Sequence, residues 1–362
     1  MLRNSFSRFF LHFFPLPRFF RAPSFGLDIS DESIKYAELL DTRVGTKMGR
    51  FGERAIPPGI IESGKIRDST RLQSILANLG KEVGIQSVRI SLPEEQVYLF
   101  KLKLEKTGLK NVRESIELVL EEHVPIAAPD AIFDYEIIGE DSQYLELEVG
   151  TIPKVVVENY LLIFKNSGLQ VQSCELEAQA IARAVVPKGD TGTYMIVDFG
   201  KKRTGIFIAS HEMVVFTSTL DIGGISLDEA IAKTFNATLE EAEKMKQEHG
   251  LERNTTNREM FSVLLNSVSV LRDEIEKHYI YWHTHKDEEG HANPPIKKIL
   301  LVGGDSNLIG LTDYLSLSMK MPVELANVWV NIDSAEHYVP EIPLQRSIAF
   351  AAALGLALGD YE

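Results

Sequence analysis

Two aspartates, Asp28 and Asp198, stand at the same place in two similar stretches. Each follows an apolar run and precedes a short polar turn and a second apolar run. A tight turn between two strands directs successive backbone N–H groups into one concavity, which binds anions. Two such turns facing each other could hold a polyphosphate from both sides, and each aspartate could hold the waters of a bound Mg²⁺. The alternative is a pair of ordinary hairpins with exposed acids.

Three residues near the turns suit a phosphate ligand. Lys35, on the second strand of the first hairpin, could bring its ammonium group to a phosphate. Gly200 lets the backbone approach a phosphate closely, and Thr204 could donate its hydroxyl. These residue types favour a binding site over two plain hairpins.

The first turn also carries Asp31 and Glu32, which would repel a polyphosphate. Lys201, Lys202 and Arg203 in the second turn could offset this repulsion. We therefore expect phosphate binding, whereas the two acids leave tight binding and turnover open.

A third glycine site lies in "ILLVGGDSNLIG" (299–310), where an apolar strand runs into Gly303 and Gly304. Asp305 and Ser306 then begin a helix. Paired glycines at such a turn let a flat or phosphate-bearing ligand lie against bare backbone. Together with the two hairpins, this turn favours a functional site over a pair of ordinary hairpins.

Other motifs do not carry chemistry. Residues 198–200 spell the Asp-Phe-Gly triplet of protein kinases, but the chain has no His-Arg-Asp triplet and no preceding Gly-x-Gly-x-x-Gly. "GIIESGKI" (59–66) nearly matches a Walker loop, but it has Ile66 where Ser or Thr would ligate magnesium, so we expect a loop. The histidines between residues 278 and 291 end a helix and enter a loop, which favours a solvated surface over a metal site.

The elements that must position these residues alternate between strands and helices. "GLDISDESIKYAEL" (26–39) and "IVDFGKKRTGIFIA" (196–209) share one plan and lie about 170 residues apart, which predicts a duplicated α/β unit. We expect a second hairpin over 132–149 and an amphipathic helix that starts near Val112. A charged helical stretch follows from about 226 to 285.

Length and composition limit the possible number of domains, the partners and the kinds of cross-link or membrane span. The chain has 362 residues, and this length predicts two domains or one bilobed unit. Its net charge of -14 argues against nucleic acid as a partner. The single cysteine, Cys174, excludes a disulfide framework, and no apolar run reaches the roughly 18 residues that span a bilayer.

The N-terminus is a separate basic-aromatic segment. Residues 1–25 contain eight phenylalanines and four arginines, and no acid precedes Asp28. We expect residues 1–23 to contact an anionic membrane surface. A disordered tail, a segment docked on protein and an organelle transit peptide are the alternatives.

The order of the two aspartate hairpins and the Gly-Gly turn resembles the actin/Hsp70/sugar-kinase ATPase fold, a duplicated ribonuclease-H-like α/β fold of two lobes with an inserted small subdomain. Within that fold, residues 24–360 resemble the PilM family of type IV pilus assembly proteins, which is related to FtsA. The resemblance is carried by "AIPPGIIESGKIRD" (55–68), "EEHVPIAAPDAIFDYEII" (121–138) and "ALGLALG" (353–359).

The resemblance implies a site for ATP and Mg²⁺. It assigns Glu177 to orient an attacking water, and Asp28 and Asp198 to hold Mg²⁺ through water. It implies that the nucleotide is bound by Asp28, Ser33, Lys35, Asp198, Gly200, Thr204, Glu243, Lys246, Gly303, Gly304 and Ser306. ATP binding is expected and hydrolysis is expected to be weak or absent.

The resemblance also implies a role and a location. The protein would be a cytoplasmic scaffold at the cytoplasmic face of the inner membrane, in the platform that assembles the pilus. It would bind the cytosolic N-terminal peptide of a PilN-like membrane protein in a groove bordered by Val112, Ile116, Phe133 and Tyr135, unless these side chains only fill a core. The alternatives are an FtsA-like membrane tether, a secretion-platform protein, and a hydrolysing ATPase or small-molecule kinase of the same fold.

The expected divisions of the chain follow the same resemblance. After the segment 1–23, they are a first subdomain (24–92, 166–193 and 343–360), an inserted subdomain (93–165), a second-lobe core (194–225 and 296–342) and a second-lobe helical subdomain (226–295).

Overall fold

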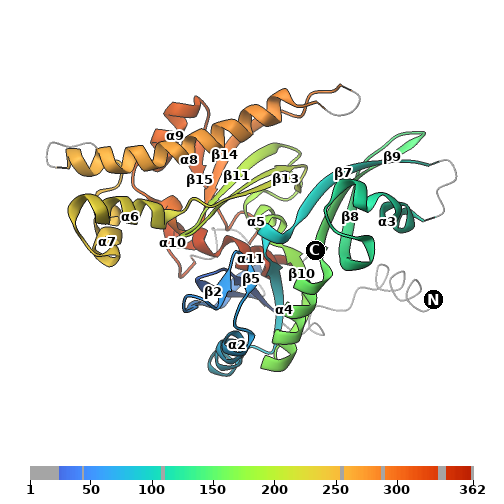
Figure 1. Ribbon diagram of the computed structural model, residues 1–362, viewed down its shortest axis with the longest axis horizontal. Helices are drawn as coiled ribbons and strands as arrows, with labels where there is room; N and C mark the ends of the chain where they lie inside the picture. Colours follow the sequence, from blue (N-terminus) through green and yellow to red (C-terminus); the bar gives the residue numbers. More distant parts are fainter. Residues whose placement is uncertain are drawn as a thin grey trace.

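The computed structural model describes residues 24–42, 45–106, 111–252, 257–286, 290–332 and 340–359. These residues form two lobes, each built on a five-stranded sheet, and a three-stranded sheet that projects to one side (Figure 1). The segment 1–23, for which we expect membrane contact, lies outside the described residues.

The two large sheets have the same topology. The first contains β1 (Phe25–Ile29), β2 (Ser33–Thr42), β3 (Gly45–Ala55), β6 (Ser87–Leu92) and β10 (Gln170–Leu176). The second contains β11 (Thr193–Phe199), β12 (Thr204–Ser210), β13 (Met213–Leu220), β14 (Ile296–Val302) and β15 (Val323–Leu325). Counted within its own lobe, each sheet has the strand order 3-2-1-4-5, with the first strand antiparallel to the second and parallel to the fourth.

The register of the two hairpins is also the same. Asp28 on β1 lies opposite Lys35 on β2, and Asp198 on β11 lies opposite Gly205 on β12, in both cases seven residues further along the chain. The predicted duplication is therefore confirmed at the level of single residues.

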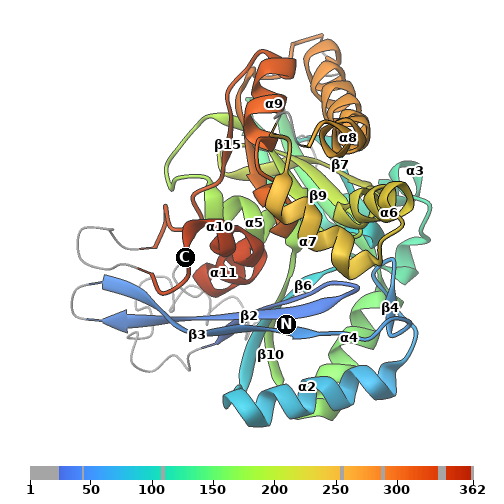
Figure 2. The same cartoon turned by 90° about the vertical axis from the view of Figure 1, so that its left-hand side faces the viewer.

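Two helices form the layer between the sheets, α5 (Glu177–Val185) and α11 (Ala351–Leu358), as Figure 2 shows. The layer is thin because small residues bring the backbones together. A Cβ added to Gly355 of α11 would lie 1.7 Å from the carbonyl oxygen of Ala180 on α5, and one added to Gly26 of β1 would lie 1.9 Å from that of Ala353. These contacts fix the position of one lobe against the other.

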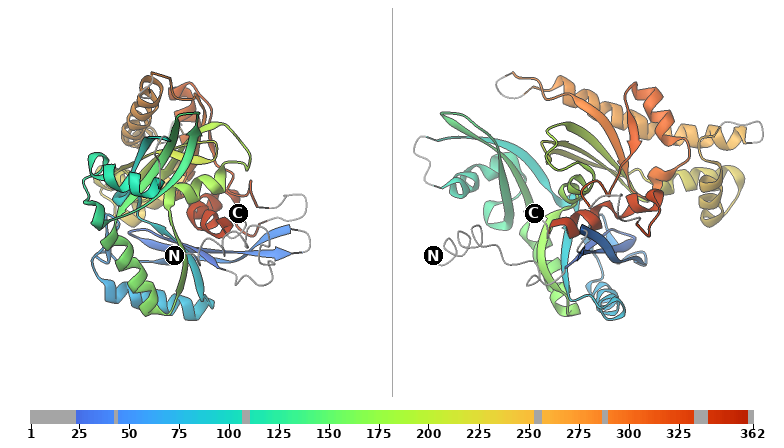
Figure 3. Two further views of the ribbon diagram at one scale, coloured as in Figure 1. Left: turned by 90° about the vertical axis from the view of Figure 1, so that its right-hand side faces the viewer. Right: turned by 180° about the vertical axis from the view of Figure 1, so that it is seen from behind.

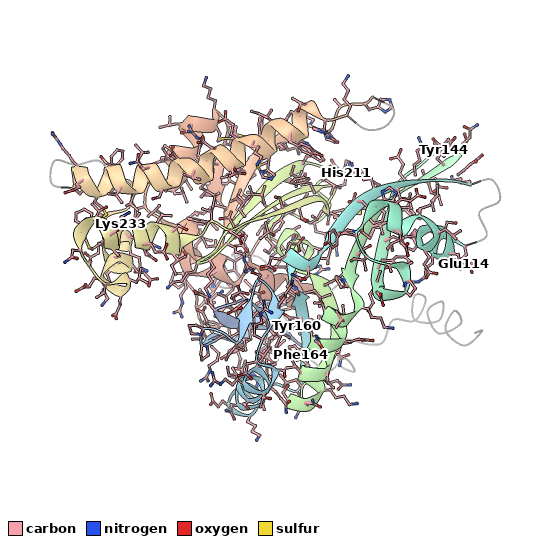
Figure 4. The ribbon with its side chains drawn as sticks, in the orientation of Figure 1. Glu114, Tyr144, Tyr160, Phe164, His211 and Lys233 are labelled. Carbon is pink, nitrogen blue, oxygen red and sulfur yellow. The ribbon has the colours of Figure 1, made fainter. Side chains whose placement is uncertain are left out.

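Helices α2 (Ser69–Val83) and α4 (Lys154–Ser167) cover the outer face of the first sheet. Tyr160 and Phe164 of α4, labelled in Figure 4, are buried in the core of this lobe. The expected inserted subdomain extends to residue 165 and would include α4, but these contacts place the helix with the first lobe.

The inserted subdomain is a sheet of β7 (Tyr98–Glu105), β9 (Tyr144–Pro153) and β8 (Ala131–Glu140), in that order, covered by α3 (Val112–His123). Figure 3 shows α3 on the side of this sheet away from the main body of the molecule. Leu147 and Val149 of the central strand are buried under α3. The predicted hairpin over 132–149 is thus the pair β8–β9.

The helices of the second lobe are α6 (Gly224–Phe235), α7 (Leu239–His249), α8 (Arg258–Thr284) and α9 (Leu311–Met319). Leu264 and Val268 of α8 share one core with Met195 and Val197 of the central strand β11. The helices of the expected subdomain 226–295 are therefore packed on the sheet of this lobe and share its core.

Short elements complete the described chain: β4 (Ile61–Glu62), β5 (Lys65–Ile66), η2 (Glu94–Gln96), η3 (Ala128–Asp130), η4 (Gly304–Asn307), α10 (Leu344–Ser347) and η5 (Ile348–Phe350). The loop expected at 59–66 contains the small hairpin β4–β5. Among the described residues, no helix is long and apolar enough to cross a membrane.

We expect Gly355→Ala to lower the free energy of unfolding by about 3 kcal/mol, because the added methyl group must displace the backbone of α5. Gly359→Ala is the matched control, since a Cβ there meets only the ends of long polar side chains, Arg89 being nearest at 3.0 Å. Urea unfolding of both variants measures the difference. Equal stability of the two variants would contradict the close contact of α5 and α11.

Candidate functional site

A cavity of about 570 Å³ lies between the two lobes, where the carboxyl ends of β1, β11 and β14 meet. Its volume is in the range of cofactor sites. Nine of the predicted nucleotide or catalytic residues line it: Asp28, Ser33, Lys35, Glu177, Asp198, Gly200, Glu243, Gly303 and Gly304. Thr204, Lys246 and Ser306 are not among the lining residues.

The two predicted aspartates are held in unlike surroundings. Asp28 is 6% exposed and accepts a hydrogen bond from the Ser91 hydroxyl at 2.9 Å. Burial raises the pKa of Asp28, and Lys35 and Ser91 oppose that rise. Burial, and then the charge of Asp28, raises the pKa of Asp198 to about 6. Burial is therefore the main cause for both carboxyls, and the charge of Lys35 offsets only part of it.

Glu177 is the first residue of α5 and shares this acidic environment. Burial, followed by the charges of Asp28 and Asp198, raises its pKa well above the ordinary value. A carboxyl at this place can accept a proton from a water in the cavity when it is ionised.

Glu94 on η2 is a fourth buried acid that the sequence did not indicate. One oxygen, Oε2, accepts a hydrogen bond from the backbone N–H of Ala178 at 3.3 Å, whereas Oε1 is buried without a hydrogen-bond partner. Burial raises the pKa of Glu94 to about 7. Its only signal in the sequence is its place after β6, the strand that lies parallel to β1 and ends at the same edge of the sheet.

Acids outnumber bases in the lining of the cavity. Ten acidic residues line it: Asp28, Asp31, Glu32, Glu53, Glu94, Glu95, Glu177, Asp198, Glu243 and Asp305. The four basic residues are Lys35, Lys201, Lys202 and Arg203. A free polyphosphate would meet net repulsion here, so an anionic ligand must bring a divalent cation with it.

The donor set fits Mg²⁺ that is held mainly by water and phosphate oxygens. The buried carboxylates of Asp28 and Asp198 and the unpartnered oxygen of Glu94 are hard oxygen ligands, which Mg²⁺ prefers. No three acidic, histidine or cysteine side chains converge to ligate a metal directly within the described part of the chain. Indirect coordination is the arrangement that these residues permit.

We predicted that three cations of the second turn offset the two acids of the first turn. The structure confirms this for two of the three cations. The Arg203 guanidinium lies 2.8 Å from Asp31, and the Lys202 ammonium lies 3.2 Å from Glu32. Both pairs join the β1–β2 turn of one lobe to the β11–β12 turn of the other. Lys201 lies instead 3.2 Å from Glu243 in its own lobe.

The backbone groups of the two turns make different hydrogen bonds. In the first, the Ser30 hydroxyl accepts hydrogen bonds from the N–H groups of Glu32 (3.4 Å) and Ser33 (3.2 Å), so these amides are already partnered. In the second, the carbonyls of Gly200 and Lys201 accept hydrogen bonds from the first N–H groups of α6. The second turn is thereby fixed to α6, and Thr204 strengthens this link by donating its hydroxyl to the carbonyl of Ile222.

The Gly-Gly turn lies against the second aspartate. Gly303 has φ of 88°, and a Cβ on it would lie 2.3 Å from a carboxylate oxygen of Asp198, so only glycine fits. Gly304 faces open space, since its nearest neighbour would be Ala349 at 4.0 Å. This turn leaves a bare surface of backbone toward the cavity. The expected helix start at Ser306 is the 3-10 turn η4, where the Ser306 hydroxyl donates to the carbonyl of Val302.

Lys246 is a positioning residue. Its buried ammonium lies 2.6 Å from Asp305, which follows the Gly-Gly turn, and 3.0 Å from Asp228 on α6. Lys246 also donates to the carbonyl of Gly224. It therefore ties α7, α6 and the Gly-Gly turn together, whereas Glu243, one turn earlier on α7, lines the cavity.

The four residues expected to border a peptide groove lie in the inserted subdomain. Ile116 is fully buried and Phe133 is 5% exposed, and both belong to the core under α3. Val112 and Tyr135 are partly buried and pack against that core. Ile116 and Phe133 thus fill the small core, which is the alternative considered for them.

We expect the free energy of unfolding to fall between about pH 4.5 and pH 7 because of Glu94. The folded protein keeps this carboxyl protonated to about pH 7, whereas the unfolded chain releases the proton near 4.5, so ionisation opposes the fold. The loss amounts to roughly 3 kcal/mol. Glu94→Gln should remove this part of the pH dependence in urea unfolding at pH 5 and pH 7.5. The exposed Glu114→Gln is the control, and identical pH dependence in wild type and Glu94→Gln would refute the assignment.

Comparison with solved structures shows an actin-like ATPase fold. The chain is similar to the "PilM-PilN type IV pilus biogenesis complex" with a TM-score of 0.77 and 21% identity, over 94% of this chain and 99% of that chain. It is similar to ethanolamine utilization protein EutJ from Carboxydothermus hydrogenoformans with a TM-score of 0.56 and 15% identity, over 95% and 91% of the two chains. MreB5 of Spiroplasma citri, bound to ADP, gives a TM-score of 0.56 and 13% identity, over 93% and 95%.

Residues 26–361 match the family model described as type IV pilus assembly protein PilM. The match covers both lobes, the inserted sheet and all three motifs that line the cavity. The chain therefore belongs to the PilM family of type IV pilus assembly proteins.

Proposed function

We propose that this protein is a nucleotide-binding scaffold of the platform that assembles type IV pili at the cytoplasmic face of the inner membrane. The observation that carries the proposal is the cavity between the lobes, lined by both aspartate hairpins and the Gly-Gly turn. Family membership supplies the pilus context.

ATP with Mg²⁺ is the ligand that this lining suits best. Its phosphates would lie between the two turns near Lys35 and Gly200, and its adenosine near Gly303, Gly304 and Glu243. Asp28 and Asp198 would hold the waters of Mg²⁺, whose charge compensates the acidic lining. MreB5, which has a similar fold, is described as bound to ADP.

The proposed protein partner is the cytosolic N-terminal peptide of a PilN-like membrane protein. A solved structure similar to this chain is that of the PilM-PilN type IV pilus biogenesis complex. In this chain, α4 runs directly from the inserted sheet to the first lobe, and its Val155 and Leu162 are 60% and 55% exposed. These exposed apolar side chains of α4, and Val112 and Tyr135 at the edge of the inserted core, could supply apolar contacts to an extended peptide. Residues 1–23 would add contact with the membrane surface.

Hydrolysis of ATP is the second candidate activity, and Glu177 is the observation that favours it. Its carboxyl lines the cavity beside Asp28 and Asp198, where it could orient a water toward a terminal phosphate. Phosphate release by wild type and by Glu177→Ala distinguishes an ATPase from a scaffold that only binds nucleotide.

We expect a synthetic peptide with the sequence of the PilN-like tail to bind the full chain more tightly with Mg-ATP than without it, because ATP between the lobes fixes their angle. Fluorescence anisotropy of the labelled peptide measures both affinities, and about a fivefold difference corresponds to ~1 kcal/mol of coupling. A peptide of the same composition in scrambled order is the control. Equal peptide affinity with and without Mg-ATP would contradict the coupling. No peptide binding in either condition would contradict the proposed partner.

A further inference from the structure

Arg203 of the β11–β12 turn is enclosed by acids from both lobes. Its guanidinium lies 2.8 Å from Asp31 and 3.5 Å from Asp221, and it also forms an ion pair with Glu95. The Arg203 side chain is only 16% exposed, although it lines the cavity. Arg203, a partly buried cation near the predicted phosphate position, is therefore already paired with carboxylates.

The carboxylates that hold Arg203 can release it at low cost. Asp31 also accepts hydrogen bonds from the N–H groups of Ser63 at 3.0 Å and Gly64 at 3.1 Å, so its charge keeps two donors when Arg203 leaves. Glu95 is 23% exposed and can turn toward solvent. Neither acid would be left buried and unpaired, which is the condition that makes breaking an ion pair expensive.

A phosphate competes well for a guanidinium, because the two groups match in a bidentate arrangement of charge-assisted hydrogen bonds. We propose that Arg203 is the cation that recognises the terminal phosphate of a bound nucleotide, and that the phosphate displaces Glu95 and Asp31 from its guanidinium. This inference rests on the nucleotide binding proposed above. It adds a binding residue and explains how the chain tolerates two acids in its first turn.

Displacement of Glu95 from Arg203 by the phosphate would also affect the start of the inserted sheet. Glu95 lies in η2, which is closed by hydrogen bonds from Gln96 N–H to Pro93 O and from Val97 N–H to Glu94 O, both 3.0 Å. Strand β7 of the inserted sheet begins at the next residue, Tyr98. When the phosphate takes Arg203, η2 loses the Glu95–Arg203 ion pair, one of its ties to the second lobe, at the point where the inserted sheet starts.

A double-mutant cycle in the full chain tests the exchange. Isothermal titration calorimetry gives the Mg-ATP affinity of wild type, Glu95→Gln, Arg203→Gln and the double variant. Glu95→Gln should bind Mg-ATP about fivefold more tightly, because the phosphate no longer competes with that carboxylate. Arg203→Gln should bind about 30-fold more weakly while its AMP affinity stays unchanged. The double variant should match Arg203→Gln alone.

Glu53→Gln is the matched control, because Glu53 lines the same cavity but pairs with Lys35 at 3.7 Å. Its effect on Mg-ATP affinity should be the same with and without Arg203→Gln. If the effect of Glu95→Gln on Mg-ATP affinity is also the same with and without Arg203→Gln, it comes only from the loss of one negative charge in the cavity. That result would refute the exchange. If the wild type binds no Mg-ATP, the proposed nucleotide function itself is refuted, and the inference falls with it.

Hydrogen–deuterium exchange tests the link to the inserted sheet. Saturating Mg-ATP should speed exchange at the amides of Gln96 and Val97 in the wild type, and the same ligand should leave those amides unchanged in Glu95→Gln, where the tie is already absent. Unchanged exchange in wild type that has bound Mg-ATP would refute this transmission.

Discussion

Negative charge buried between the two lobes governs how the residues around the cavity are arranged. Asp28, Glu94, Glu177 and Asp198 share one cavity, and burial raises the pKa of each of them. The fold tolerates this arrangement by protonation and by ion pairs at the rim, such as Lys202 with Glu32. A ligand that carries Mg²⁺ would compensate the same negative charge, so the charge of the cavity lining favours such a ligand.

The duplicated sheets create this site by symmetry. Equal strand order and equal register bring Asp28 and Asp198 to corresponding ends of the two central strands. The thin layer of α5 and α11 then sets the distance between them, because Gly26 and Gly355 allow backbone contact. Lys246 holds the Gly-Gly turn in place through Asp305, so that the third motif faces the other two. Positioning is therefore shared between small residues in the core and one buried cation.

The parts of this arrangement that are local in sequence were predictable. A hairpin, a Gly-Gly turn and an amphipathic helix each show in a short stretch, and the repeat of Asp28 at Asp198 revealed the duplication. Apart from the ion pairs between the two turns, the contacts between distant segments were not predictable. Nothing near Glu94 indicates that it meets α5, 84 residues later. The burial of Lys246 depends on Asp228 and Asp305, and the place of α4 depends on packing of Tyr160 into the first lobe.

With so acidic a lining, the cavity should accept a nucleotide only together with a divalent cation. Isothermal titration of the full chain with ATP at pH 7.5, once with excess Mg²⁺ and once with a chelator, measures this requirement. We expect binding with Mg²⁺ and an affinity at least about 100-fold weaker without it, a difference of ~2.7 kcal/mol. Equal affinity in the two titrations would contradict it, because the ten lining acids would then not govern which ligand binds.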